Sequence, residues 1–397
     1  MITHFIKELL HLPAYDWIHT SKPNGTWIFH LSPKYRQTIC PVCGSASRRK
    51  AETGRFLRHT HTASTGIIWI RVPRERRACT GCGATFTASL PDLPDRGSAT
   101  EMFQEMVVQA CIGRSIADGA RTFGLPYTTL ERWFYRRAPA LLPVSTPTVV
   151  TVDDFAFRKG HTYGVAAMDW HTGQVLAIGR GRSTAAIAHL LDQLPDTIDS
   201  VVTDGAPAMA QAVHHTCPDA DHILDRFHLI RWFTEALARR RRYLNVDRRH
   251  HGAKRRAVRL LSRPPESLSD REREEVRGWC RDGPIRAIYQ ALQHLRYVLK
   301  SRTWPQARYR MNDWQRRFLF HPTAVVRDMG QSILKRENGV LAAAARPESN
   351  GAAEGTNHKI KLIQRRGHGY RNFGHLSLRI RLETGNRRRR LVKSMFW

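Results

Sequence analysis

Between residues 148 and 206 the apolar residues fall into short runs that turn residues bound. The stretches VVTVDD, HTYGVAAMDW and QVLAIGRG predict three consecutive strands, and short turns containing Gly160 and Gly173 connect them. Apolar residues then recur every three or four positions in STAAIAHLLDQL, which predicts a helix over 183–194. IDSVVTDGA predicts a fourth, buried strand over 198–206.

Two more units follow in the same alternating order. PAMAQAVHHTC predicts a helix that Pro207 opens, and DHILDRFHLI predicts a strand running into another helix. The order is therefore an antiparallel meander of three strands followed by crossover units. This is the order of the ribonuclease H-like fold, a mixed α/β sheet in which the first and fourth strands are neighbours. We therefore predict a multidomain α/β protein with such a sheet in its second half.

A helical pattern precedes this region in SIADGARTFGLPYTTLERWFYRR, Ser115 to Arg137. Ser115 is placed to cap a first helix together with Asp118, and Gly124 supplies the turn before a second helix. Ala120, Phe123, Leu125, Leu130 and Trp133 form its apolar face. The spacing is typical of a helix-turn-helix, with a bare αα-hairpin as the alternative. The residues that a recognition helix would offer to DNA are Tyr127, Thr128, Thr129, Arg132 and Arg136.

Two cysteine pairs, CPVCG and CTGCG, lie nearer the N-terminus. Each pair offers two thiolates with a glycine that permits a tight turn, and two such knuckles enclose one tetrahedral Zn²⁺. The predicted ligands are Cys40, Cys43, Cys79 and Cys82. Because four thiolates fill the coordination sphere, we expect a structural zinc and no role for His59 or His61. Alternating stretches between the pairs, such as GIIWIRV, predict the strands of a zinc ribbon.

Composition changes the picture mainly through charge. The chain has 64 Lys and Arg residues against 34 Asp and Glu, a formal charge of +30, which favours a polyanionic partner such as nucleic acid. No stretch approaches the roughly 18 apolar residues of a membrane span, so we expect a soluble intracellular protein. The basic clusters Arg239 to Arg242 and Arg387 to Arg390 are candidate phosphate contacts, although charge runs are usually solvated surface.

These patterns predict four regions. They are an N-terminal segment (1–35), a zinc ribbon (36–92), a helix-turn-helix domain (93–140) and a ribonuclease H-like domain (146–397) with an α-helical insertion at about 230–345.

Carboxylates interrupt this basic chain at the ends of predicted neighbouring strands. Asp153 or Asp154 ends the first strand and Asp204 the fourth, so these acids can meet. Transfer of a phosphodiester requires charge stabilisation on two oxygens, which two Mg²⁺ ions about 4 Å apart provide. Because successive strand residues point to opposite faces, only one member of the Asp153 and Asp154 pair can enter such a site. Asp225 also ends a strand, but a helix cap is its simpler role.

A third carboxylate ligand must come from farther along the chain. Glu354 lies at the start of a predicted helix, from which it can lean over the sheet. Glu348 is the rival, and a loop residue or cap is its simpler interpretation.

Taken together, the motifs resemble one family. The matching blocks are CPVCG, CTGCG, the helix-turn-helix segment, VDDFAFRKGHTYG, VVTDGA, DRFHLI and SNGAAEGTNHKIKLIQRRGHGYRNF. They resemble the ISL-three family of bacterial insertion-sequence transposases, which carry a zinc ribbon, a helix-turn-helix and a DDE catalytic domain. Matched position by position, the resemblance implies that Asp153, Asp204 and Glu354 form the catalytic, Mg²⁺-binding triad.

The resemblance also implies a function. It is that of a DNA transposase that binds the terminal inverted repeats of its element and cuts and rejoins strands with Mg²⁺ or Mn²⁺. Double-stranded DNA, including target DNA, is the implied partner, with a homodimer as the implied assembly and the bacterial cytoplasm and nucleoid as the implied location. A DNA-binding regulator that no longer cuts and a ribonuclease H-like nuclease without strand transfer stay open as alternatives.

Overall fold

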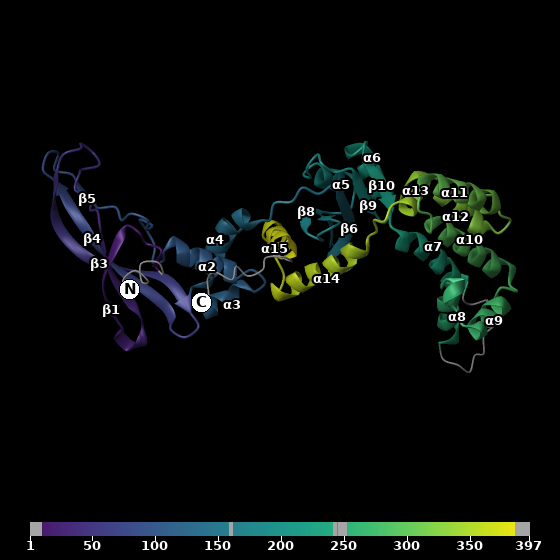
Figure 1. The fold of residues 1–397 in the computed structure, drawn as a ribbon, viewed down its shortest axis with the longest axis horizontal. Helices are drawn as coiled ribbons and strands as arrows, with labels where there is room; N and C mark the ends of the chain where they lie inside the picture. The colour runs from purple at the N-terminus through teal and green to yellow at the C-terminus, as the bar shows by residue number, and fades with distance from the viewer. Residues whose placement is uncertain (1–9, 159–161, 241–243, 245–251, 386–397) are drawn as a thin grey trace. The chain divides into compact units, whose positions relative to one another are not determined.

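The computed structural model describes residues 10–158, 162–240, 244 and 252–385, apart from the side chains of Arg158, Ala352 and Glu354. The chain divides into two compact units, Met1–Leu141 and Leu142–Trp397 (Figure 1). Among the described residues, no helix is both long enough and apolar enough to cross a membrane.

The first unit is built on a sheet with the strand order β1-β2-β4-β3, in which β5 also pairs with β4. The strands are β1 (Tyr15–Ser21), β2 (Ile28–Pro33), β3 (Ser47–Thr62), β4 (Gly66–Cys79) and β5 (Thr85–Thr87), with a short 3-10 helix η1 (Pro23–Gly25) after β1. The long antiparallel β3–β4 hairpin confirms the strands predicted between the cysteine pairs. β1 and β2 were not predicted, and their apolar side chains share one core with Leu57 and Ile70 of the hairpin.

Helices complete this unit. They are α2 (Glu101–Ala110), α3 (Ile116–Thr122) and α4 (Tyr127–Arg137), followed by the 3-10 turn η2 (Ala138–Leu141). As predicted, the Ser115 hydroxyl caps α3 by accepting a hydrogen bond from the backbone N–H of Asp118 at 3.0 Å, and Gly124 turns the chain with a φ of 55°. The predicted apolar face of both helices is buried. The closest approach is at Gly119, where an added Cβ would lie 2.3 Å from Cys111 and 3.0 Å from Leu130.

The second unit contains a mixed sheet with the strand order β10-β9-β6-β7-β8. Its strands are β6 (Val149–Arg158), β7 (Thr162–Asp169), β8 (Val175–Arg180), β9 (Ser200–Thr203) and β10 (Asp221–Leu224). The first three form the predicted antiparallel meander, while β9 runs parallel to β6 and β10 parallel to β9. The prediction that the first and fourth strands are neighbours is confirmed.

Helices cover both faces of this sheet (Figure 1). On one face α5 (Thr184–Leu191) and α6 (Pro207–Thr216) pack against Val150 and Val152 of β6. On the other face α14 (Gly351–Arg366) and α15 (Phe373–Gly385) pack around Phe155 of the same strand. Because side chains alternate along a strand, this pattern tells which face each residue of β6 occupies.

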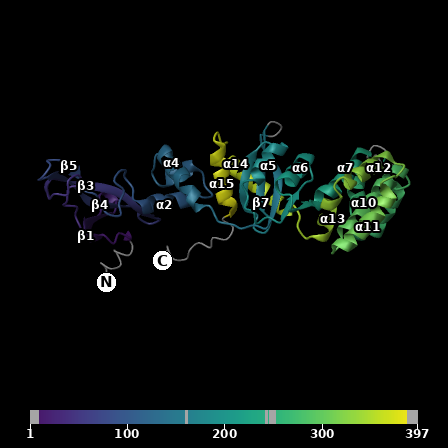
Figure 2. The ribbon, with the colours of Figure 1, turned by 90° about the horizontal axis from the view of Figure 1, so that it is seen from above.

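A run of helices separates β10 from α14, where a helical insertion is predicted. It comprises α7 (Arg226–Arg240), α8 (Ala253–Leu261), α9 (Asp270–Trp279), α10 (Gly283–Leu299), α11 (Trp304–Phe318), α12 (Ala324–Leu334) and α13 (Glu337–Ala345), with a 3-10 turn η4 (Pro265–Ser267) before α9. Figure 2 shows α10, α11, α12 and α13 gathered into one bundle. The indole of Trp314, 1% exposed, donates a hydrogen bond to the Ala291 carbonyl at the centre of this bundle.

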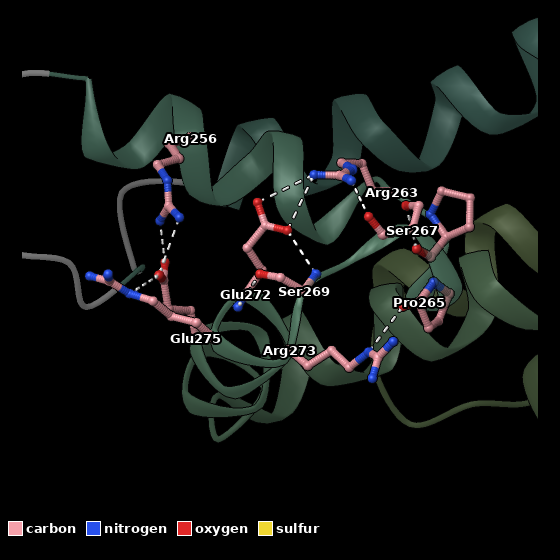
Figure 3. Close-up of polar contacts among 10 residues, drawn as sticks. Arg256, Arg263, Pro265, Ser267, Ser269, Glu272, Arg273 and Glu275 are labelled. Atoms are coloured by element: carbon pink, nitrogen blue, oxygen red, sulfur yellow. Dashed lines mark hydrogen bonds and ion pairs between the residues drawn. The ribbon is translucent and has the colours of Figure 1, made fainter.

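Ion pairs join α8 to α9 (Figure 3). Arg256 of α8 pairs with Glu275 of α9, and Arg263 donates to Glu272 at 3.3 Å. Glu272 also completes a capping box with Ser269 at the start of α9. Arginines of the insertion are thus paired with its own acids, which reduces the charge they offer to a polyanion. Of the predicted basic clusters, Arg239 and Arg240 end α7, and the remaining members, Arg241, Arg242 and Arg387 to Arg390, lie outside the described residues.

The packing of α14 on the sheet gives a stability prediction. Ile360 of this helix is 0% exposed in the core it shares with Phe155, whereas Leu362 on the same helix is 59% exposed. Ile360→Ala is expected to lower the free energy of unfolding of the second unit by about 2 to 5 kcal/mol, because it removes buried methyl groups and leaves a cavity. Leu362→Ala is the matched control and should change it by less than about 0.5 kcal/mol. Urea unfolding followed by circular dichroism measures both values, and equal losses would contradict the packing described.

Candidate functional site

Acidic residues follow β9 and β10 directly, at the carboxyl ends of these strands. Asp153 and Asp154 were expected to end the first strand, but they lie in the middle of β6, which continues to Arg158 past the end of its pairing with β9. Thr151 of β6 pairs with Val202 of β9, so the same register carried two residues further sets Asp153 beside Asp204. Thr203 of β9 pairs with Leu224 of β10, and the backbone N–H of Asp225 donates to the Thr203 carbonyl at 2.8 Å. Asp153, Asp204 and Asp225 therefore lie where the parallel pairing of three neighbouring strands ends, and these three residues are called the row of acids below.

Asp153 and Asp154 differ in what they face. Asp153 belongs to the side of β6 that carries Phe155 and packs against α14, while Asp154 belongs to the side of Val152. One carboxylate oxygen of Asp153 accepts a hydrogen bond from the Asn357 amide of α14 at 2.9 Å, and the other accepts one from the backbone N–H of Asp154 at 2.9 Å. The alternation therefore separates the two acids as expected. Asp153 is the one whose carboxylate bonds α14, while Asn357 reaches only the backbone carbonyl of Asp154, at 3.5 Å.

The acids at this edge repel one another. Burial, then the charge of Asp154, and to a lesser degree that of Asp204, raise the pKa of Asp153 to about 6. Burial and the charge of Asp204 also raise the pKa of Asp154, although Arg182 and His228 oppose this shift. Ionised carboxylates that are held together in this way favour a bound cation, and oxygen ligands of this kind suit Mg²⁺ or Mn²⁺.

The two rivals for the third carboxylate occupy different places. Glu354 lies in the first turns of α14, three residues before Asn357, and its side chain lies outside the described residues. Three residues make almost one helical turn, so its position is on the side of the helix from which Asn357 reaches Asp153. Glu348 lies in the loop before α14, is 8% exposed and pairs with the Arg346 guanidinium at 3.5 Å. Glu348 is thus a buried loop residue, as its simpler interpretation predicts.

Asp225 is a helix cap, as predicted, but it has further partners. One of its carboxylate oxygens accepts from the backbone N–H of His228 at 3.2 Å and from the His228 ring Nδ1 at 2.8 Å, while the other accepts from the backbone N–H of Asn350 at 3.0 Å. Burial pushes the pKa of Asp225 up, but the hydrogen bonds from His228 and Asn350 outweigh it and hold the pKa below its ordinary value.

Sequence reasoning missed two polar residues at this edge, His228 and Asn357. Both follow an acid by three positions, Asp225 in DRFH and Glu354 in EGTN, and such spacing on a helix brings side chains together. That spacing is the signal that would have found them.

The four predicted cysteines come together in the first unit. Their sulfur atoms all lie within 4.8 Å of one another, with Cys43 and Cys79 at 3.4 Å, an arrangement that can hold a metal ion. Gly44 and Gly83, which follow the two pairs, adopt φ values of 73° and 72° that side-chain-bearing residues rarely take. His59 does not join the cluster, because its two ring nitrogens contact the Leu10 carbonyl and the Thr100 hydroxyl.

The helix pair α3–α4 presents the residues that were predicted to meet DNA. Tyr127, Thr128, Arg132 and Arg136 are exposed and Thr129 is half-buried. Arg136 also donates a hydrogen bond to Gln104 of α2 at 3.0 Å, so part of its side chain braces the helices.

Comparisons with known proteins agree with these features. A family model described as a transposase matches residues 150–380, more than half of the chain, and one described as the helix-turn-helix domain of transposase family ISL3 matches residues 88–138. The transposase for insertion sequence element IS1001 of Bordetella parapertussis is 27% identical over 379 residues, which are 90% of this chain and 92% of that protein. The transposase for insertion sequence element IS1557 of Mycobacterium tuberculosis is 26% identical over 255 residues, which are 56% of this chain and 57% of that protein.

The raised pKa of Asp153 predicts a stability difference that depends on pH. In the metal-free protein Asp153→Asn should be more stable than the wild type at pH 8 by up to about 3 kcal/mol, because each unit by which folding raises the pKa costs about 1.4 kcal/mol once the carboxyl is ionised. The advantage should shrink as the pH falls through 6. Most of it should be lost by pH 4, close to the ordinary pKa of the unfolded chain, below which Asp153 is protonated in both the folded and the unfolded state.

Urea unfolding in EDTA between pH 4 and pH 8 measures this difference. The exposed Asp196→Asn variant controls for the loss of one negative charge. A stability difference for Asp153→Asn that stays constant with pH would contradict the assignment of a repelled, buried carboxylate.

Proposed function

Since this chain belongs to transposase family ISL3, we propose that it recognises the terminal inverted repeats of its own bacterial insertion sequence and cuts and rejoins DNA strands at them. The observation that carries the proposal is the position of Asp153 and Asp204, where the parallel pairing of β6 and β9 ends, with Asn357 of α14 bonded to Asp153. The strand order is the one expected of a ribonuclease H-like fold, which supports phosphodiester chemistry at this edge.

We assign Asp153, Asp204 and Glu354 as the catalytic triad that holds divalent metal, Mg²⁺ or Mn²⁺. The mutual repulsion of Asp153, Asp154 and Asp204 fits a cation site, because a bound cation removes it. When bound, two such ions activate the nucleophile and stabilise charge on the attacking and leaving oxygens. Asn357 holds the Asp153 carboxylate in one orientation throughout.

The proposed reaction has two steps, hydrolysis and strand transfer. Water attacks the phosphodiester at the element end, which leaves a 3′-hydroxyl on the element and a 5′-phosphate on the flanking DNA. The 3′-hydroxyl then attacks a phosphodiester of the target DNA, forming a new phosphodiester bond and releasing a 3′-hydroxyl of the target strand. No protein side chain becomes covalently linked to DNA in either step, so the acids serve only as ligands. Joining two element ends to one target calls for two active sites, which favours a homodimer.

The first unit supplies DNA recognition in this proposal. The residues of α4 assigned to base and phosphate contacts are Tyr127, Thr128, Thr129, Arg132 and Arg136. The cysteine cluster holds a structural Zn²⁺, because four thiolates leave no open coordination position. The formal charge of +30 supports binding to DNA, because Lys and Arg side chains are attracted to the phosphates of the DNA backbone.

The triad assignment predicts a separation of cleavage from binding. Asp204→Asn should lower the rate of Mg²⁺-dependent cleavage of terminal-repeat DNA by at least about 100-fold, since a lost metal ligand removes several kcal/mol of transition-state stabilisation. Its affinity for the same DNA should stay within about threefold, because phosphate and base contacts lie elsewhere. Single-turnover cleavage and fluorescence anisotropy measure these quantities, with Asp196→Asn as the control. Wild-type cleavage by Asp204→Asn would refute the catalytic assignment.

The zinc assignment predicts a loss of metal from a single substitution. Wild-type protein should contain one equivalent of zinc, and Cys79→Ser should contain much less, because three thiolates and a hydroxyl bind Zn²⁺ poorly. The same variant should bind terminal-repeat DNA more weakly. Cys217→Ser, in the second unit and outside the cluster, is the matched control and should keep its zinc. Plasma mass spectrometry measures the metal, and full zinc content in Cys79→Ser would refute a four-cysteine site.

A further inference from the structure

Asp225 occupies the third place in the row of acids but is not free to bind a metal. It follows β10 as Asp204 follows β9, so by position alone it would be a further ligand. Its side chain is nearly fully buried, and three N–H groups from His228 and Asn350 already use both of its carboxylate oxygens. The Asp225 carboxylate thus holds the His228 ring and the backbone of Asn350 in place.

The Asp225 carboxylate fixes the orientation of the His228 ring. Its Nδ1 lies 2.8 Å from Asp225, which as an ionised carboxylate only accepts hydrogen bonds, so Nδ1 carries a proton. The side chain is 25% exposed, and within the part of the chain that the structure describes no protein group bonds Nε2. The ring therefore has one nitrogen fixed and the other open.

The ring lies beside the proposed catalytic acids. It comes from the first turn of α7, directly after the strand that borders β9, and so stands at the same edge of the sheet as Asp204. The hydrogen bond to Asp225 raises the pKa of His228 despite its burial, and the charges of Asp204 and Asp153 raise it further. In turn His228 opposes the rise in the pKa of both Asp153 and Asp154. The open nitrogen thus belongs to a ring that favours the cationic form at the place where a phosphodiester would bind.

We propose that His228 is a substrate-contacting residue whose Nε2–H donates a hydrogen bond to a non-bridging oxygen of the phosphodiester held at the Asp153 and Asp204 edge, while Asp225 clamps the ring at Nδ1. This inference rests on the proposed function. The chemistry is complementary, since the substrate oxygen is anionic and a donor that is fixed before the reaction begins stabilises its negative charge.

Single-turnover cleavage of terminal-repeat DNA by His228→Ala and His228→Gln tests the proposal. His228→Ala should cleave about 100-fold more slowly than the wild type, the effect of losing one fixed donor to a reacting phosphate. His228→Gln, which keeps an N–H donor of similar reach, should recover at least about tenfold of this loss. The exposed His215→Gln variant of α6 is the control and should cleave at the wild-type rate. Binding of the same DNA in Ca²⁺, within about threefold of wild type, establishes that each variant is folded.

A second measurement separates a phosphate contact from a purely structural role. The scissile phosphate is replaced by each of its two phosphorothioate diastereomers, and cleavage is measured in Mn²⁺, which tolerates sulfur better than Mg²⁺ does. The wild type should be slowed by sulfur at the oxygen that His228 contacts, and His228→Ala should lose this difference between diastereomers. An unchanged difference would overturn the proposal.

Metal binding and wild-type activity discriminate the remaining outcomes. Metal-free His228→Ala should bind Mn²⁺ as the wild type does in an electron paramagnetic resonance titration, and a loss of Mn²⁺ would overturn the proposal by showing a metal ligand. An active His228→Ala variant would overturn this assignment alone. A wild-type protein that does not cleave would overturn the proposed function and this assignment with it.

Discussion

The parallel pairing of β6, β9 and β10 is the constraint on which the rest of the second unit depends. Parallel neighbours end at the same edge of a sheet, and in-register residues point to the same face. Val202 beside Thr151 and Leu224 beside Thr203 therefore bring Asp153, Asp204 and Asp225 into one row, although 72 positions of sequence numbering separate the first from the last (225 − 153). Asn357 on α14 and His228 on α7 each make a hydrogen bond to a member of that row, Asn357 to Asp153 and His228 to Asp225.

The row brings like charges together in a strongly basic chain. Two members of the region, Asp153 and Asp154, have raised pKa values because burial and neighbouring carboxylates disfavour their ionised forms. The pKa of Asp225 is lowered instead, because His228 and Asn350 donate three N–H hydrogen bonds to its carboxylate. This end of the sheet thus contains two kinds of buried carboxylate. The ionised form of Asp153 is destabilised unless a cation binds, whereas hydrogen bonds already stabilise the ionised form of Asp225. Position in the fold does not distinguish Asp225 from Asp153 and Asp204, but its hydrogen bonds do, because they leave the proposed metal-ligand role to Asp153 and Asp204.

Residue patterns predicted the sheet well because its strands carry strong signals. Apolar runs separated by turns with Gly160 and Gly173 predicted β6, β7 and β8, and Pro207 marked the start of α6. The prediction that β6 and β9 are neighbours came from the order of the elements, which is that of the ribonuclease H-like fold. β1 and β2 were not predicted, since their burial comes from packing against the distant β3–β4 hairpin. Strand alternation showed that Asp153 and Asp154 differ but not which one faces α14, because the contact with Asn357 joins residues 204 positions apart. The spacing of three residues in DRFH indicates that His228 contacts Asp225, but its position near Asp153 and Asp204 appears only in the folded structure.

The junction between the sheet and the helical insertion explains how so long an interruption leaves the site intact. The chain leaves the sheet at Asp225 and returns to it at Asn350, and the Asp225 carboxylate bonds the backbone of that returning residue. The next residue, Arg226, donates from its guanidinium to the carbonyls of Ala343 and Arg346 at the end of α13. Two consecutive residues therefore tie the departure of the chain to its return. The helix α14 begins directly after Asn350, the residue that Asp225 holds. These contacts of Asp225 and Arg226 therefore position the start of α14, which contains Glu354, whatever the length of the insertion.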